Sequence, residues 1–171
     1  MGEQTRSCFL AVAFAATVAS CCAPESLTDE NKTESVGTAF VTRTIHAASH
    51  WNDTGLQVEP NTDYRVVAQG VWHDAWIASG PEGYPSPNCL MHSVESWRRV
   101  PDAPWFALIC SVDRKEELAQ QVFTRPFPEE SPPLRFSVGG QLTCFANDAF
   151  RFYWNNWGEI RIAVRRADGG R

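Results

Sequence analysis

Three short side chains that end in hard oxygens lie near the C-terminus of this 171-residue chain: Asp148, Asn155 and Asn156. They occupy the two ends of a loop between two strand-like stretches, residues 141–146 and 159–164. Closing a hairpin over this loop would bring the three side chains together. Calcium takes about six to eight oxygen ligands, so the loop can supply half of a calcium shell. The alternative is a long hairpin loop made of turn formers, because Asn and Asp adopt αL and bond their own backbone.

The start of the chain has the pattern of an export signal. Arg6 precedes an apolar run over residues 9–18, which is too short to span a bilayer and has the length of a signal-peptide core. The run ends in Val-Ala-Ser-Cys at residues 18–21, which resembles a bacterial lipobox, in which the cysteine is lipidated and becomes the new N-terminus. Ordinary cleavage that leaves Cys21 unmodified is the alternative. We predict a lipoprotein signal peptide over residues 1–20 and membrane anchoring of an exported bacterial protein through Cys21.

The remaining chain divides into a tether and one domain. Residues 21–37 are rich in Ser, Thr, Glu and Asp and contain few large apolar residues, which predicts a flexible tether. Residues 38–167 have the size of one domain with one core, and residues 168–171 form a short tail. No other stretch has the length of a transmembrane helix.

Composition excludes some classes of function. A net charge of −5 and a pI near 5.3 give no basic stripe for a nucleic acid. No Cys-x-x-Cys spacing occurs, which argues against zinc. Three cysteines fall in the domain, Cys89, Cys110 and Cys144, and an exported chain can oxidise two of them, but the sequence does not choose the pair.

The domain reads as strand after strand, with turn formers at residues 52–55 and 60–63. The strand patterns are residues 40–46, 64–68, 105–112, 134–138, 141–146 and 159–164. The stretch 105–112 is continuously apolar and therefore predicts a strand buried on both faces. Residues 114–121 are the one short, polar helical pattern. Many short strands separated by turns predict an all-β antiparallel β-sandwich or jelly roll.

The segment 73–104 has no sustained period and is longer than structureless loops usually are. Its aromatic residues, among them Trp76, Tyr84 and Trp97, favour an ordered, packed loop. Exposed rings beside polar groups suit sugars, since the apolar face of a pyranose stacks on a ring. The alternative is that these rings plug the open end of the sandwich, because an aromatic side chain buries a large apolar area.

Taken in order, several segments carry a family resemblance. They are residues 51–55 (WNDTG), 64–72 (YRVVAQGVW), 80–83 (GPEG), 107–109 (ALI), 147–148 (ND) and 155–158 (NNWG). Together they resemble the PA-IL (LecA) type of bacterial calcium-dependent, galactose-binding lectin and the wider set of galactose-binding-like jelly-roll domains. The resemblance spans residues 40–164, and its most specific piece is Asn-Asp, six residues, then Asn-Asn-x-Gly. It implies a galactose-binding-like jelly roll.

The resemblance also implies a calcium ligand set. By position, Asp148, Asn155 and Asn156 bind through their side chains, and Phe152 and Asp74 bind through backbone carbonyls. In the family the sugar's hydroxyls complete the calcium shell, which places the glycan at the same loop.

The sugar contacts depart from the family pattern. The polar His and Gln that follow the family's Gly-Pro-x-Gly fall here on Pro87 and Leu90. A shift of the alignment would bring Asn88 or His92 into reach instead. We therefore expect sugar binding by Asp148 and Asn155, with Trp76, Tyr84, Trp154 and His92 as further contacts.

Two other classes of protein compete with a lectin. For an enzyme, the chain offers scattered histidines and carboxylates but no Gly-x-Ser-x-Gly, His-Glu-x-x-His or phosphate-binding glycine loop, so we expect no enzymatic activity. The second competitor is a structural cell-envelope domain that keeps the fold without binding sugar, because fold does not imply function.

Overall fold

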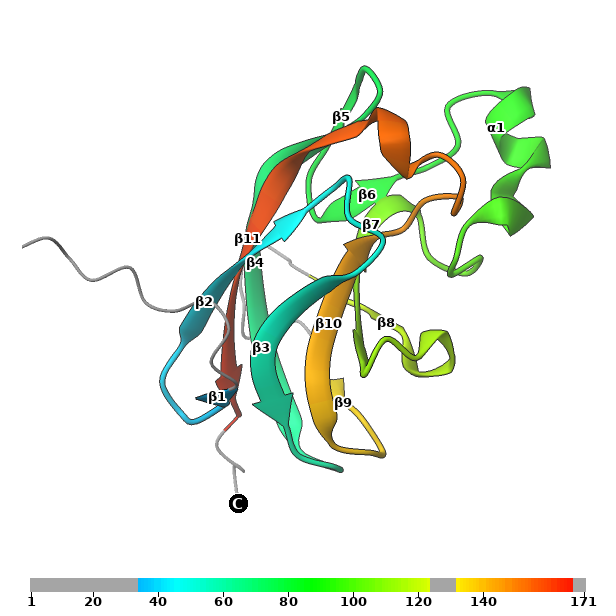
Figure 1. Cartoon of the computed structure of the whole chain (residues 1–171). Helices are drawn as coiled ribbons and strands as arrows, with labels where there is room; N and C mark the ends of the chain where they lie inside the picture. Colours follow the sequence, from blue (N-terminus) through cyan, green and yellow to red (C-terminus); the bar gives the residue numbers. More distant parts are fainter. Residues whose placement is uncertain (1–33, 124–131, 168–171) are drawn as a thin grey trace, which may run out of the picture.

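The computed structural model describes residues 34–123 and 132–167 (Figure 1). The predicted signal peptide, Cys21, most of the predicted tether and the tail at residues 168–171 lie outside the described residues. Within the described part of the chain, no helix is long and apolar enough to cross a membrane.

Two sheets pack face to face as a β-sandwich (Figure 1). The first sheet has the strand order β1-β3-β10-β7-β6, with β8 also paired to β7. Its strands are β1 (Glu34–Ser35), β3 (Asn52–Val58), β6 (Glu82–Tyr84), β7 (Trp105–Val112), β8 (Gln120–Gln121) and β10 (Gly140–Ala146). The second sheet has the order β2-β11-β4-β5, with β9 paired to β4. Its strands are β2 (Val41–His46), β4 (Asp63–Asp74), β5 (Ile77–Ser79), β9 (Leu134–Arg135) and β11 (Asn156–Arg166).

The all-β prediction is confirmed, and the pairing is antiparallel except between β1 and β3, which are parallel. The jelly-roll connectivity stays a prediction. The apolar strand β7 is buried along its whole length, as its continuous pattern predicted. One of its faces contributes Phe106 and Leu108 to the main core, and the other contributes Ala107 and Ile109 to a second cluster.

Residues 52–55 were predicted as a turn, and this prediction is wrong because they begin strand β3. Their polar side chains are satisfied within the sheet: Asn52 donates to the Cys144 carbonyl at 3.2 Å, and Thr54 donates to the Leu142 carbonyl at 2.6 Å. Gly55 has φ of 69°, and the β3–β10 register shifts here, so the glycine marks a β-bulge within the strand rather than a turn.

The segment 73–104 is ordered, with short elements of its own. They are the end of β4, strands β5 and β6, helix α1 (Cys89–Ser93) and the 3-10 helix η1 (Glu95–Trp97). The predicted helical pattern at residues 114–121 forms only the 3-10 helix η2 (Glu116–Leu118) and then β8. A further 3-10 helix, η4 (Tyr153–Asn155), precedes β11.

The structure shows which two cysteines pair, a question that the sequence left open. Cys110 of β7 and Cys144 of β10 lie directly opposite each other and form a disulfide, whereas Cys89 is free and exposed on α1. The disulfide lies in the main core, which both sheets line.

The folded domain begins earlier than the predicted boundary at residue 38. Glu34 and Ser35 pair with β3, the Val36 side chain is buried in the core, and the Gly37 carbonyl accepts a hydrogen bond from the Arg166 amide at 2.7 Å. Residues 34–37 therefore belong to the domain rather than to the tether, because Val36 contributes apolar area to the core.

Candidate metal centre

The loop that carries Asp148 and Asn155 connects the two sheets, since β10 belongs to the first sheet and β11 to the second. The hairpin expected from the sequence is therefore wrong. The crossover nevertheless brings the ends of the loop together, because the Asn156 side-chain amide donates to Asp148 Oδ2 at 2.9 Å. In Figure 1 this loop, drawn in orange, lies at one end of the sandwich.

Asp148 is a buried carboxylate with two donors. Its side chain is 2% exposed, and its Oδ1 accepts the Ala149 amide at 2.7 Å. Burial raises the pKa of Asp148 to about 6, and the nearby Asp74 carboxylate adds to this, while the donors from Asn156 and Ala149 oppose it. A carboxylate held in this way binds a proton or a cation more readily than an exposed one does.

Asp74 brings a second carboxylate to the same place. It is the last residue of β4 and pairs with Asn156 in the β4–β11 ladder. Its Oδ2 accepts a hydrogen bond from the Tyr84 hydroxyl, and its side chain also bonds that of Asn155. Burial raises the pKa of Asp74 above its usual range. The resemblance implied a role for the Asp74 carbonyl, whereas the structure turns its carboxylate toward the cluster.

Two amide oxygens in this cluster have no partner. Asn155 Oδ1 and Asn156 Oδ1 are both buried, and neither finds a hydrogen-bond donor among the described residues. Each amide directs its NH₂ group to a carboxylate, Asn155 to Asp74 and Asn156 to Asp148, which leaves both oxygens free to face a cation. Buried polar atoms are rarely left unpaired, so these two oxygens are candidates for binding a ligand.

Two carboxylates and two amide oxygens form a hard, all-oxygen donor set that suits calcium. Among residues 34–123 and 132–167, no three His, Cys, Asp or Glu side chains gather into a metal-binding group.

Asn147 fixes the start of the loop. Its side-chain oxygen accepts the Val100 amide, and its NH₂ group donates to the carbonyls of Val100, Ala103 and Pro104, all within 2.9–3.0 Å. Asn147 thereby fastens residues 100–104 against the end of β10. The neighbouring Asp148 starts from a backbone position that these bonds hold.

Arg99 and Tyr153 form a hydrogen-bonded pair that packs against the loop. The Arg99 side chain is 3% exposed, lies over the rings of Trp51 and Phe145, and donates to the Tyr153 hydroxyl at 3.0 Å. That hydroxyl in turn donates to the Ala146 carbonyl, and burial raises the pKa of Tyr153 to about 12. The Arg99 amide donates to the Asp148 carbonyl at 3.2 Å, so Arg99 contacts the start of the loop directly.

The other predicted contacts lie in different settings. The Phe152 carbonyl accepts the Asn155 amide at 3.1 Å within the turn that opens η4. His92 projects from α1, with Nδ1 at 3.1 Å from a Glu95 oxygen, and the structure brings it into no contact with Asp148 or Asp74. Trp76 and Trp154 are 88% and 81% exposed.

Tyr84 differs from the exposed ring platform that the sequence suggested, because it is partly buried and its hydroxyl bonds Asp74.

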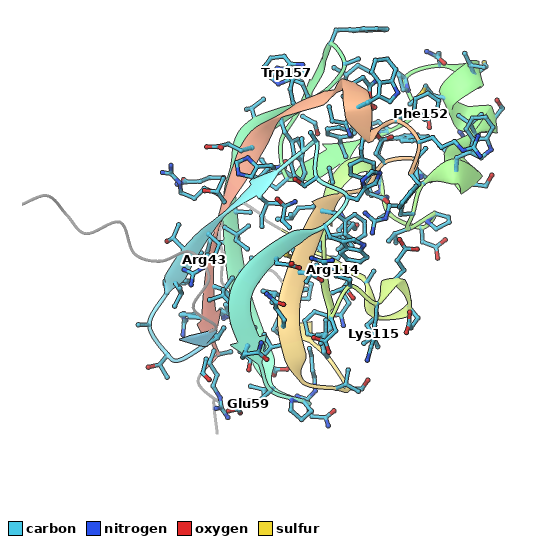
Figure 2. All side chains as sticks on the ribbon, viewed as in Figure 1. Arg43, Glu59, Arg114, Lys115, Phe152 and Trp157 are labelled. Carbon is cyan, nitrogen blue, oxygen red and sulfur yellow. A yellow bond between two sulfur atoms is a disulfide. The ribbon has the colours of Figure 1, made fainter. Side chains whose placement is uncertain are left out.

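Trp157 was not predicted as part of the site. It stacks on His73 with centroids 3.5 Å apart and is 54% exposed. Figure 2 shows Trp157 and Phe152 at the same end of the sandwich, whereas Glu59 lies at the opposite end.

Comparison with known proteins gives one kind of match. No protein-family model matches the chain, and no curated protein matches it. Among solved structures, the chain is similar to a domain described as "EclA N-terminal domain; PllA-like lectin", with a TM-score of 0.54 and 16% sequence identity over 75% of this chain and 98% of that domain. This chain has the fold of a lectin domain. At 16% identity the likeness concerns the β-sandwich and not the LecA family in particular.

Proposed function

We propose that this protein is a calcium-dependent carbohydrate-binding protein that recognises galactose or a related sugar. The observation that carries the proposal is the pair of buried, unpartnered amide oxygens of Asn155 and Asn156 beside the buried carboxylate of Asp148 and the partly buried carboxylate of Asp74. The lectin fold of the similar structure supports the sugar-binding part.

Asp148, Asp74, Asn155 and Asn156 would hold the cation, with the Phe152 carbonyl as a further ligand. Bound calcium supplies open positions that vicinal sugar hydroxyls fill as paired hard oxygens. The exposed rings of Trp76 and Trp154 offer apolar faces on which a pyranose can stack. None of these roles requires an acid–base step, in keeping with a binding protein rather than an enzyme.

The metal part is tested by thermal melting of the purified protein in calcium and in chelator. Calcium at about 100 times its Kd should stabilise the fold by about 2.7 kcal/mol, because it binds only the native state. Asp148→Ala should abolish this response while the metal-free protein still folds. Asp63→Ala is the matched control, since Asp63 pairs with Arg135 away from the cluster. Identical melting curves with calcium and with chelator would reject the metal site.

The sugar part is tested on a glycan array in calcium, in chelator and with Asn155→Ala. Calcium-dependent hits that the variant loses would establish a lectin, and the array would name the sugar. Turnover of a glycoside would overturn the binding-protein assignment.

A structural cell-envelope domain is the second candidate. It is favoured by Pro87 and the exposed Leu90, which stand where the family's polar sugar contacts would be, and by Tyr84, whose hydroxyl already occupies an Asp74 oxygen. Calcium binding together with an empty array would support this candidate.

We also propose that the protein is an exported bacterial lipoprotein anchored through Cys21. Lipobox processing adds more than one acyl chain, which anchors a protein firmly. Cys21→Ser should release the protein from the membrane fraction of cells that express the full chain. Retention of the variant in that fraction would reject the anchor.

A further inference from the structure

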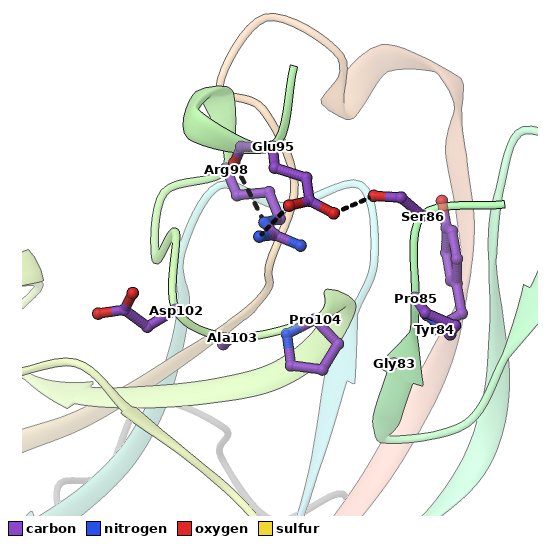
Figure 3. Close-up of a pocket in the computed structure, with 9 residues that line it drawn as sticks. All are labelled: Gly83, Tyr84, Pro85, Ser86, Glu95, Arg98, Asp102, Ala103 and Pro104. Atoms are coloured by element: carbon purple, nitrogen blue, oxygen red, sulfur yellow. Dashed lines mark hydrogen bonds and ion pairs between the residues drawn. The ribbon is translucent and has the colours of Figure 1, made fainter. Parts of the chain in front are cut away.

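Figure 3 shows the residues that line a groove, whose volume is about 340 Å³. Two stretches line it, one at Gly83–Ser86 and the other within residues 95–104. Tyr84 belongs to both sites, because its side chain lines the groove while its hydroxyl bonds Asp74. The volume falls within the roughly 300–1,000 Å³ of small-molecule sites.

Fixed polar groups face this groove. The Ser86 hydroxyl donates to Glu95 and accepts the Trp105 indole N–H at 3.1 Å. The hydrogen bond from Ser86 lowers the pKa of Glu95, which keeps this carboxylate ionised. Arg98 donates to the Glu95 carbonyl at 3.1 Å and to the Pro101 carbonyl, and its guanidinium lies 5.4 Å from the centroid of the Trp105 ring.

The groove is fastened to the metal loop. Arg98 forms a β-bridge with Ala149, and the Asn147 side chain bonds the carbonyls of Ala103 and Pro104, two residues of the groove lining. One connected unit therefore presents the groove and the cluster together, and a ligand that spans both would meet a pre-organised surface.

We propose that this groove binds a second, neutral sugar ring of an oligosaccharide whose terminal ring lies at the Asp74–Asp148 cluster. The inference rests on the proposed function. Glu95 and Asp102 can accept hydroxyl hydrogens, and the prolines at 85 and 104 offer apolar surface to the faces of a ring. A neutral ring is favoured because the lining holds two carboxylates against one guanidinium, Arg98, which is already engaged by Glu95 and Pro101.

The test measures calorimetric affinities in calcium for galactose, for neutral galactose-terminated disaccharides and for a disaccharide whose second ring is a uronic acid. A neutral disaccharide should bind about tenfold more tightly than galactose, the change expected from one or two hydrogen bonds to charged groups. Glu95→Gln and Ser86→Ala should each remove most of that gain and leave the affinity for galactose unchanged. Glu117→Gln, an exposed acid of η2 outside the groove, is the matched control.

Equal affinity for galactose and every neutral disaccharide, or an equal loss for both ligands in the variants, would overturn the groove while leaving the lectin proposal intact. Tighter binding of the uronic-acid disaccharide than of the neutral disaccharides would contradict the proposal that the groove prefers a neutral sugar ring. Binding of no sugar at all, with the calcium response preserved, would overturn the lectin and the groove together.

Discussion

Asn147 and Asp148 are adjacent and both buried, but the polar groups around Asn147 are all hydrogen-bonded, whereas some of those around Asp148 are not. The side chain of Asn147 has its oxygen and both amide hydrogens engaged by residues 100–104. The cluster around Asp148 contains two amide oxygens without a partner and a second carboxylate close by. A satisfied polar network stabilises and orders a fold, whereas an unsatisfied one costs free energy unless a ligand completes it. The first environment therefore holds the loop, and the second is where a ligand is expected.

The largest effect expected from this comparison is the destabilisation caused by Asn147→Ala. It should lower the free energy of unfolding by about 3–5 kcal/mol, because it leaves the Val100 amide and three carbonyls without their buried partner. Urea denaturation of the metal-free protein measures this change. Asn88→Ala is the matched control, since that side chain makes one exposed capping bond to Met91 and its loss should cost about 1 kcal/mol. Equal losses in the two variants would remove the distinction.

Asp148→Asn should instead raise the free energy of unfolding in the absence of metal. With a folded pKa of about 6 against an ordinary value of 3.8, ionised Asp148 costs the fold up to roughly 3 kcal/mol at pH 7. The neutral amide removes this cost, and rotation of the Asn156 amide can present its oxygen to the new NH₂ group. We expect higher stability in chelator at pH 7, little change at pH 4, and no response to calcium. Destabilisation at pH 7 would show that the carboxylate is a structural partner like Asn147.

The calcium response should depend on pH in a defined window. Because the folded pKa of Asp148 is raised, the metal-free fold gains stability as pH falls through about 6 toward 3.8. Calcium needs the ionised carboxylate, so protons compete with it below about pH 6. The rise in melting temperature on adding calcium should be complete at pH 7.5 and small at pH 5. The same rise at both pH values would contradict the placement of Asp148 in the metal shell.

The smallest effect on stability is expected at the exposed rings outside both environments. Trp154→Ala and Trp76→Ala should each change the free energy of unfolding by less than about 0.5 kcal/mol. If the rings stack on sugar, each variant should lower sugar affinity by roughly threefold to tenfold. Phe40→Ala, at an exposed ring beside Arg165 on another part of the sandwich, is the control for both readouts.

The sequence predicted those parts of the molecule that depend on local pattern. The alternation in β2 and the continuous apolar run of β7 identified strands, because burial on one face or two leaves a direct trace in sequence. Asp148, Asn155 and Asn156 were identified as a group because a single loop carries them. The prediction of a turn at residues 52–55 was wrong, because local propensity did not reveal that Asn52 and Thr54 would bond across the sheet.

The missed features depend on contacts between distant segments. The carboxylate of Asp74 joins the cluster because β4 pairs with β11 in a register that sets Asp74 opposite Asn156. Pairing of Cys110 with Cys144 depends in the same way on the register of β7 and β10. The crossover from β10 to β11 could not be told from a hairpin, since both connect consecutive strands by one loop.

The direction of β11 has a consequence for how the protein can be immobilised. The strand leaves the cluster at Asn156 and ends at Arg166, and its 11 residues span about 35 Å at the usual rise of a strand. The amino-terminal pair, Glu34 and Ser35, meets β3 near that same far end, beside Leu56 and Gln57. A bead, chip or fusion partner joined at either end of the domain would leave the end of the sandwich that carries the Asp148 cluster facing outward into solution. Surface-based assays can therefore attach the domain at either of its ends, near residue 34 or residue 167, without covering the site that they measure.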